Sequence, residues 1–377
     1  MKKKELELLE KLVSLPSFVD KKNNEKKVAD FVFEYLRQFS FLEVTRQKIS
    51  KDRSNIIAKT KGSPQLFFAG HMDTVLPKNN IHSIKKENGK LFGLGALDTK
   101  GGIAALLAAI GEMGEIKNTS FLFYCDEEYH FEGMRSFLEG NSEKVGKFGI
   151  VIEPTNLKIW NAHRGLIEIS FDIEGVRGHA ANKNSGISAT KIMLKLLSDF
   201  ELFLDGFSHP VLGESTLNIA FLSGGLGGEN KGDNNLSVNY QGNIIPDFAR
   251  SVIEIRTASP KLDSEKVLSF LKKQAKKYKV TITRISVKHN LGSLFTPENE
   301  WKNISKIVHS VVGKSEILPP QTKGYGDGQL LSEKKKIPVI YLGPSGEGAH
   351  SADEYVNISS LTSLKEIYKK ILEEYSM

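Results

Sequence analysis

Residues that can bind a metal ion follow four short apolar runs of this chain. The runs LFFAG, FLFYC, FGIVI and VIYLG each lead, directly or through a glycine-rich segment, to histidine or acidic residues. A further acid lies in LFGLGALDTKGG, shortly before the apolar run IAALLAAI. Imidazole and carboxylate groups are ligands that zinc and related divalent ions take in hydrolases. In chain order the candidates are His71, Asp73, Asp98, the acids at 126–128, Glu153 and His350.

The apolar runs also predict the elements that position these side chains. Runs of four to six apolar, β-branched or aromatic residues bounded by glycine or charge are typical of buried strands. Strands of nearly continuous apolar character that alternate with helical stretches indicate a parallel α/β sheet. In such sheets, ligands bind beyond the carboxyl ends of the strands. We therefore expect the candidates to converge on one crevice, as in a dinuclear metal hydrolase.

Each candidate has a simpler interpretation when it is taken alone. His71 and Asp73 share one face of an extended strand, where Asp73 is placed to orient the imidazole, but the pair could merely end a strand. Asp98 could be the N-cap of the following helix. Glu153 could belong to a strand-terminating turn, and the acids at 126–128 could form a turn of their own.

The candidates carry more weight together. If their segment is extended, Glu127 and Glu128 point to opposite sides, so one could bind a metal while the other faces the substrate as a base. Two histidines and three carboxylates suit two zinc-like ions that share one bridging carboxylate. This set consists of His71, Asp98, Glu128, Glu153 and His350.

The composition limits the class of protein. A chain of 377 residues exceeds one ordinary hydrophobic core, so we expect two domains. The single cysteine, Cys125, excludes a disulfide framework within the chain, and no run approaches the ~18 apolar residues of a membrane helix. Glu5, Glu7 and Glu10 interrupt the basic start, which therefore differs from a signal peptide. We expect a cytoplasmic protein without a membrane partner.

The net charge of +7 comes from lysines scattered among glutamates. Solvated helix faces account for this pattern most simply, although such a field would also favour anionic substrates. No recognisable nucleic-acid-binding module accompanies the charge, so we expect no nucleic-acid partner.

The pattern of elements changes near Gly165 and again near residue 289. Residues from about 3 to 160 alternate helix and strand, whereas the strands of residues 165–288 alternate apolar and polar residues in the order β-α-β-β-α-β. We expect an α/β fold with a doubly wound, mostly parallel sheet in a catalytic domain of residues 1–164 and 289–377. An α/β sandwich of residues 165–288 would be inserted as a lid or dimerisation domain.

In this order, the segments GHMDTV, GLGALDTKGG, CDEE, EPT and AHSADEYV resemble the five metal-site segments of the M20 family of co-catalytic zinc peptidases and deacylases. The resemblance covers essentially the whole chain and implies two divalent ions, zinc in first place and cobalt or manganese as alternatives. It implies that His71 and Glu153 hold one ion, that Glu128 and His350 hold the other, and that Asp98 bridges both.

The same resemblance assigns two further roles. Glu127 falls at the position of the catalytic base, and Asp73 falls at that of an aspartate behind the metal ligands. The family often has a cis peptide bond after the bridging aspartate, here between Asp98 and Thr99.

The resemblance extends to the inserted domain. GVRGHAANKNSGISA is similar to the segment whose histidine, here His179, reaches the active site of the partner subunit in a homodimer. NIIPDFARSVIEIR is similar to the substrate-carboxylate segment, which implies roles for Asn243 and Arg256. Without the resemblance, His179 would be an ordinary surface histidine and Arg256 a strand salt-bridge partner. Two segments depart from the family: Leu94 stands where arginine is frequent, and GYGDGQ replaces a TSDGR-like loop.

The expected reaction is hydrolysis of the amide bond of a small N-acyl amino acid, as in acetylornithine deacetylase or succinyl-diaminopimelate desuccinylase. A glutamate carboxypeptidase-like enzyme or a dipeptidase of the same family, with a dipeptide-like substrate, is the alternative. A non-catalytic binding protein on the same fold would be expected to lack a ligand or the base. None of these positions is lost in this chain.

Overall fold

The structure, a computed structural model, describes residues 3–77, 84–140, 145–182, 184–230, 236–321 and 324–376. The chain forms two compact units. Unit 1 consists of Met1–Asn161, Thr296–Pro319 and Gly326–Met377, and unit 2 consists of Ala162–Phe295 and Pro320–Tyr325. That residues 165–288 form an inserted domain of their own stays a prediction. No helix in the described parts of the chain is long and apolar enough to cross a membrane.

Unit 1 is built on a mixed β-sheet. Its strands are β1 (Leu42–Lys48), β2 (Ser54–His71), β5 (Lys117–Tyr124), β6 (Phe148–Val151) and β16 (Val339–Tyr341). The runs SNIIAKT and QLFFAG, predicted as separate strands, are the two halves of β2. From residue 56 to 59 of β2, the number of the paired β5 residue falls from 123 to 120. From residue 66 to 71 it rises from 119 to 124, so this second half runs parallel to β5. This second half also runs parallel to β6, and β6 runs parallel to β16.

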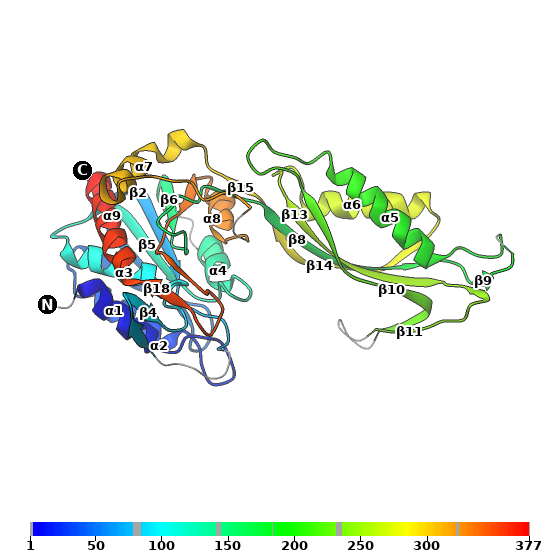
Figure 1. The fold of residues 1–377 in the computed structure, drawn as a ribbon, viewed down its shortest axis with the longest axis horizontal. Helices are drawn as coiled ribbons and strands as arrows, with labels where there is room; N and C mark the ends of the chain where they lie inside the picture. The colour runs from blue at the N-terminus through cyan, green and yellow to red at the C-terminus, as the bar shows by residue number, and fades with distance from the viewer. Residues whose placement is uncertain are drawn as a thin grey trace. The chain divides into compact units, whose positions relative to one another are not determined.

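Helices cover both faces of this sheet (Figure 1). Phe67 and Phe68 are neighbours on β2, so their side chains point to opposite faces. Phe67 stacks on Phe137 of α4 (Glu132–Gly140), with 5.6 Å between ring centroids. Phe68 contacts Tyr368 of α9 (Ile358–Ser376) edge-on at 5.2 Å. Unit 1 also contains α1 (Lys4–Val13), α2 (Lys26–Leu36), α3 (Lys100–Glu112), α7 (Glu298–Val312) and α8 (Gly328–Lys335).

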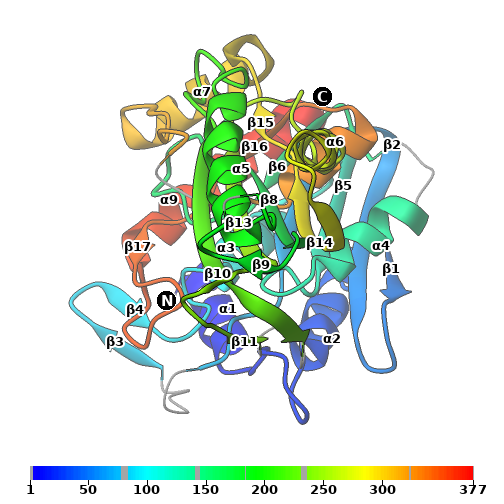
Figure 2. The ribbon, with the colours of Figure 1, turned by 90° about the vertical axis from the view of Figure 1, so that its right-hand side faces the viewer.

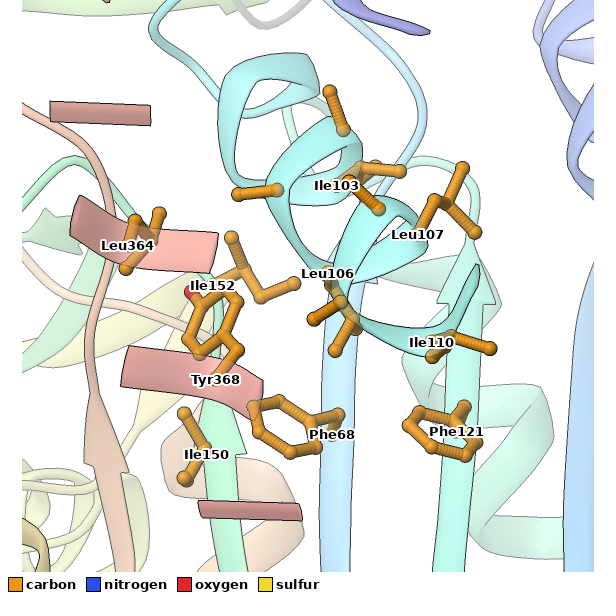
Figure 3. Packing of buried hydrophobic residues seen from close by; sticks show 14 of the residues in the cluster. Phe68, Ile103, Leu106, Leu107, Ile110, Phe121, Ile150, Ile152, Leu364 and Tyr368 are labelled. Carbon is orange, nitrogen blue, oxygen red and sulfur yellow. The ribbon is translucent and has the colours of Figure 1, made fainter. Parts of the chain in front are cut away.

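Helix α3 lies inside the main core of unit 1. Every residue from Lys100 to Ile110 is buried, as expected for a helix that is apolar on all sides. Figure 3 shows the apolar side chains of this helix packed with residues of the neighbouring strands and of α9; the labelled ones are Phe68, Ile103, Leu106, Leu107, Ile110, Phe121, Ile150, Ile152, Leu364 and Tyr368. This packing fixes the start of α3, and with it the preceding Asp98, relative to the strands.

A second sheet of unit 1 places the His350 segment beside the segment that precedes Asp98. Its order is β17 (Gly346–Glu347), β18 (Tyr355–Asn357), β4 (Lys90–Phe92) and β3 (Lys85–Glu87). Tyr355 of β18 lies opposite Phe92 of β4. The loop that joins β17 to β18 carries His350.

Unit 2 consists of a five-stranded antiparallel sheet with two helices on one face (Figures 1 and 2). Alternate residues of β8, from Ile167 to Ile173, are buried under α5 and α6, which explains the apolar–polar alternation in the sequence. The run IIP becomes β12, which pairs with β9 outside this sheet. The elements are β7 (Ala162–His163), β8 (Gly165–Glu174), β9 (Gly178–His179), α5 (Ala189–Leu204), β10 (Thr216–Asn230), β11 (Leu236–Asn239), β12 (Ile244–Ile245), β13 (Phe248–Thr257), α6 (Ser264–Lys277), β14 (Thr281–Leu291) and β15 (Leu294–Phe295).

Candidate metal centre and active site

Most of the candidate ligands lie at the carboxyl ends of the parallel strands of unit 1. His71 is the last residue of β2, and the glutamates 127 and 128 follow β5 after a short gap. Glu153 comes two residues after the end of β6. In the register of the sheet, His71 lies opposite Tyr124, the last residue of β5. Because parallel strands end at the same edge of a sheet, these side chains meet there.

Two groups of side chains hold their ligand atoms within 4.8 Å of one another, and they share Asp98. One group is His71, Asp98 and Glu153, and the other is Asp98, Glu128 and His350. Nε2 of His71 lies 3.1 Å from Oδ1 of Asp98. Nε2 of His350 lies 3.4 Å from Oδ2 of Asp98 and 3.0 Å from Oε1 of Glu128. Each oxygen of Asp98 therefore faces a different histidine, which is the arrangement that a bridging carboxylate requires.

The electrostatics of this cluster favour an added positive charge. Burial raises the pKa of Glu153, and the nearby carboxylate of Asp98 raises it further. Burial likewise raises the pKa of Glu128. Burial alone would lower the pKa of His71, but hydrogen bonds with Asp73 and Asp98 raise it well above its usual value. In the absence of metal, protons on the histidines and glutamates would offset the repulsion between the acids.

The residues present fit a pair of divalent ions. Oε1 of Glu153 is buried without a hydrogen-bond partner in the described part of the chain, and it lies 3.8 Å from Nε2 of His71. An unpaired buried carboxylate oxygen is costly, and a cation bound between it and His71 would satisfy it. The donor set of imidazole nitrogens and carboxylate oxygens is one that zinc accepts.

Asp73 anchors the segment that carries the two glutamates. Its Oδ1 accepts the backbone N–H of Glu127 at 3.1 Å, and its Oδ2 accepts that of Glu128 at 2.9 Å. Nδ1 of His71 lies 3.2 Å from the backbone oxygen of Asp73 and 3.5 Å from its Oδ1. Asp73 is buried, so one residue positions the imidazole of a ligand candidate and the backbone of both glutamates.

The expectation that Glu127 and Glu128 occupy an extended segment is wrong. Residues 127–130 form a turn, because Asp126 adopts a left-handed conformation with φ of 71°. The Asp126 carboxylate accepts the backbone N–H groups of His130 and Glu132, which closes the turn. Both glutamates consequently face the cluster, and their ligand atoms lie within 4.8 Å of one another and of that of His71.

The interpretation of Asp98 as a helix N-cap is also wrong. Thr99 occupies the N-cap position of α3, and its side chain makes no capping hydrogen bond. Asp98 precedes it, and the peptide bond between the two residues is cis, as the resemblance implied. The side chain of Asp98 is thereby left to the cluster.

A buried ion network supports the turn of the two glutamates, and the sequence alone did not indicate it. Arg53 donates to both carboxylate oxygens of Glu25 and to Oδ1 of Asp126. Glu25 in turn accepts the backbone N–H of Asp126. The acid of CDEE that received no role is therefore the one that shapes the turn. No local signal links it to residues 25 and 53, which are distant in the sequence.

The substrate-site candidates belong to unit 2 and lie in two separate places. His179 and Ile244 are register partners of β9 and β12, so the exposed His179 is next to the exposed Asn243. Arg256 lies at the other end of β13, where it pairs with Glu254 at 2.9 Å and lies over the ring of Tyr325. The structure groups the first two residues and separates them from Arg256 within the chain.

A second arginine, Arg164, lies near Arg256 in unit 2, and the sequence alone did not indicate it either. Arg164 precedes β8 and donates to the backbone oxygen of Glu214 and to Thr216 Oγ1. Burial lowers the pKa of Arg164, and the positive charge of Arg256 lowers it further. Arg164 therefore lies just before β8, two residues from Leu166, the register partner of Arg256 on β13. The sequence alone could not indicate this proximity, because 92 positions separate the two arginines.

Comparison with known proteins agrees with this geometry. Residues 67–374 match peptidase family M20/M25/M40. The chain belongs to this family. It is therefore classed with the M20 hydrolases, several of whose curated members have comparable length.

Acetylornithine deacetylase of Buchnera aphidicola subsp. Schizaphis graminum is 26% identical over 98% of this chain and 97% of its own. Succinyl-diaminopimelate desuccinylase of Rickettsia rickettsii (strain Sheila Smith) is 25% identical over 97% and 98%. Among solved structures, aminopeptidase PepT of Bacillus cereus ATCC 10987 superimposes with a TM-score of 0.77 at 19% identity, covering 99% of this chain and 98% of PepT. The last similarity establishes the mixed α/β fold that this M20 member shares with PepT.

Proposed function

We propose that this M20 hydrolase cleaves the amide bond of a small N-acyl amino acid with the help of two divalent metal ions, zinc in first place. The observation that carries the proposal is the position of Asp98, whose Oδ1 lies near His71 and whose Oδ2 lies near His350. His71 and Glu153 would hold one ion, Glu128 and His350 the other, and Asp98 both. Bound ions would supply an acidified water and a charge that polarises the scissile carbonyl.

Glu127 is the proposed general base. Burial raises its pKa well above the ordinary value, and the negative charge of Glu153 adds to the effect although His71 opposes it. A carboxylate with a raised pKa is suited to accept a proton from water and to return it to the leaving amine. Asp73 supports this role because it fixes the backbone of Glu127.

Arg256 and Arg164 are the proposed binding site for a substrate carboxylate. A guanidinium group binds a carboxylate through two parallel hydrogen bonds, and two such groups strengthen the preference for an anion. Every N-acyl amino acid carries at least one free carboxylate. The family's N-acyl-amino-acid hydrolases in the comparison favour this substrate class over a dipeptide, which is the alternative.

His179 is proposed to act in the site of a partner chain, with residues 165–288 as a lid and dimerisation domain. Phe248 and Arg256 are eight residues apart on β13, which corresponds to roughly 26 Å along a strand. His179 lies beyond the Phe248 end, so one chain cannot bring His179 and Arg256 to the same small substrate. A symmetric homodimer would provide the second copy. Asn243, next to His179, would contact the same substrate.

The substrate proposal is tested with purified, zinc-loaded protein on a panel of N-acetyl amino acids, N-succinyl amino acids and dipeptides. Turnover of the N-acyl substrates at a kcat/KM at least tenfold above the dipeptides is expected. The reverse order would establish the dipeptidase alternative. Absence of turnover together with absence of bound metal would indicate a non-catalytic protein.

The dimer proposal is tested by mixing two inactive variants, His179→Ala and Glu127→Gln. A mixed dimer contains one site with an intact Glu127 facing an intact His179, so about a quarter of the wild-type activity should return if the chains exchange at random. Exchange is verified with differently tagged chains. If exchange occurs and no activity returns, His179 does not act across the dimer.

A further inference from the structure

A single buried carboxylate holds the segment that presents Asp98. The Glu354 side chain belongs to a residue that is 1% exposed. Its Oε2 accepts the backbone N–H of Gly95 at 2.9 Å, and its Oε1 accepts those of Leu97 at 2.8 Å and of Asp98 at 2.9 Å. Hydrogen bonds to an ionised acceptor are shorter and stronger than neutral ones. The backbone of Asp98 is thus tied directly to this carboxylate.

The backbone of Glu354 holds the same segment from the other side. Its carbonyl oxygen accepts the N–H of Gly93 at 3.0 Å, at the point where β18 pairs with β4. Glu354 therefore contacts four backbone N–H groups of residues 93–98. Since it lies only four positions after His350, it also sets the distance between the His350 loop and Asp98.

The segment of residues 93–98 is tightly packed around Gly95. Gly95 has φ of 79°, and a side chain there would come within 2.6 Å of Thr74 and 3.1 Å of Lys100. The turn is therefore pressed against its neighbours, and its residues Gly95 and Leu97, whose amides donate to Glu354, are buried. Three amides without an acceptor would be costly there, so the turn would rearrange and move the Asp98 carboxylate with it.

We propose that Glu354 is a positioning residue of the metal centre, which holds Asp98 where its two oxygens can bridge two ions. The proposal rests on the dinuclear function proposed above. Glu354 lies in the AHSADEYV segment, yet its position in the sequence does not indicate this role. Its partners lie more than 250 positions earlier in the chain.

The test compares Glu354→Gln with Asp353→Asn, a control that removes the same charge from the exposed neighbouring residue. Glutamine keeps the size of the side chain, but its NH₂ group would face an amide N–H where an acceptor is needed. Residues that orient ligands typically contribute 10–100-fold to metal affinity. We therefore expect zinc affinity, measured by competition with a chromophoric chelator on the metal-stripped protein, to fall by about 10–100-fold in Glu354→Gln. Asp353→Asn should stay within about twofold of wild type.

Circular dichroism with and without zinc separates this role from a merely structural one. A variant that is folded but binds zinc weakly supports the proposal, as does a variant that folds only when zinc is in excess. A folded variant with wild-type zinc affinity overturns it. A variant that stays unfolded in excess zinc also overturns it, because Glu354 would then be needed for the fold itself. If the wild-type protein binds no zinc, the dinuclear function fails instead.

Discussion

Replacing Glu127 by glutamine should abolish most turnover and leave both metal ions bound. The backbone N–H groups of Glu127 and Glu128 donate to the two oxygens of the same Asp73, so neither anchor depends on the glutamate side chains. Oε1 of Glu128 lies 3.0 Å from Nε2 of His350. The Glu127 carboxylate makes no hydrogen bond to any other described residue, which leaves it available to a substrate water.

The expected loss follows from the role of a general base. Such groups contribute about 10²–10⁴-fold to the rate, which corresponds to about 2.7–5.4 kcal/mol of barrier. Glutamine has the same volume and cannot accept the proton, so kcat should fall by this factor while KM changes little. Glu128→Gln is the matched variant. It makes the same chemical change one residue away but alters a proposed ligand, so its zinc content should drop from two ions to one.

The assay combines kcat on the best substrate of the panel with elemental analysis of the same protein sample. Two ions and a large loss of kcat in Glu127→Gln, beside the loss of one ion in Glu128→Gln, is the expected pair of results. If Glu127→Gln keeps near-wild-type kcat with two ions, the base must be another group. If it loses an ion as Glu128→Gln does, Glu127 is a ligand and the assignment of the two glutamates is wrong.

Three other measurements test the energetics of the two units. Phe68→Ala should lower the free energy of unfolding by about 3–5 kcal/mol in urea titrations, because the ring is fully buried between α9 and the sheet. Asp172→Asn should lower the free energy of unfolding by about 3–5 kcal/mol, because it breaks a buried ion pair in which Arg250 donates two hydrogen bonds at 2.6 Å to the Asp172 carboxylate. A smaller loss than that caused by Glu316→Gln, which breaks an exposed pair, would contradict the burial argument. Zinc stabilisation, measured as the shift of Tm, should grow from pH 6.5 to pH 9. Hydrogen bonds with Asp98 and Glu128 raise the pKa of His350 to about 10. Protonated His350 therefore stabilises the metal-free protein fully below about pH 6.5, and this stabilisation is lost as the pH rises toward 10. A zinc-induced shift of Tm that becomes smaller with rising pH would refute this.

The sequence alone determined which chemistry the chain could perform and which elements would present it. Apolar runs that end in histidine or acid mark buried strands, because only strand ends allow such polar groups to leave the core. His71 was therefore predicted at a strand end and is the last residue of β2, and Glu153 was predicted just after a strand and comes two residues after the end of β6. The helix that starts after Asp98 was evident from its length and composition.

Only the tertiary structure decided how these side chains face one another. The turn of residues 127–130 depends on Asp126, whose partners Glu25 and Arg53 come from distant parts of the chain. The same holds for Glu354, which binds amides that lie more than 250 positions away. Local periodicity reports which residues are apolar and how they alternate, but a hydrogen bond between distant segments leaves no periodic trace. The candidate ligands were therefore predictable from local sequence, whereas the residues that hold them in place became visible only after the chain had brought them together.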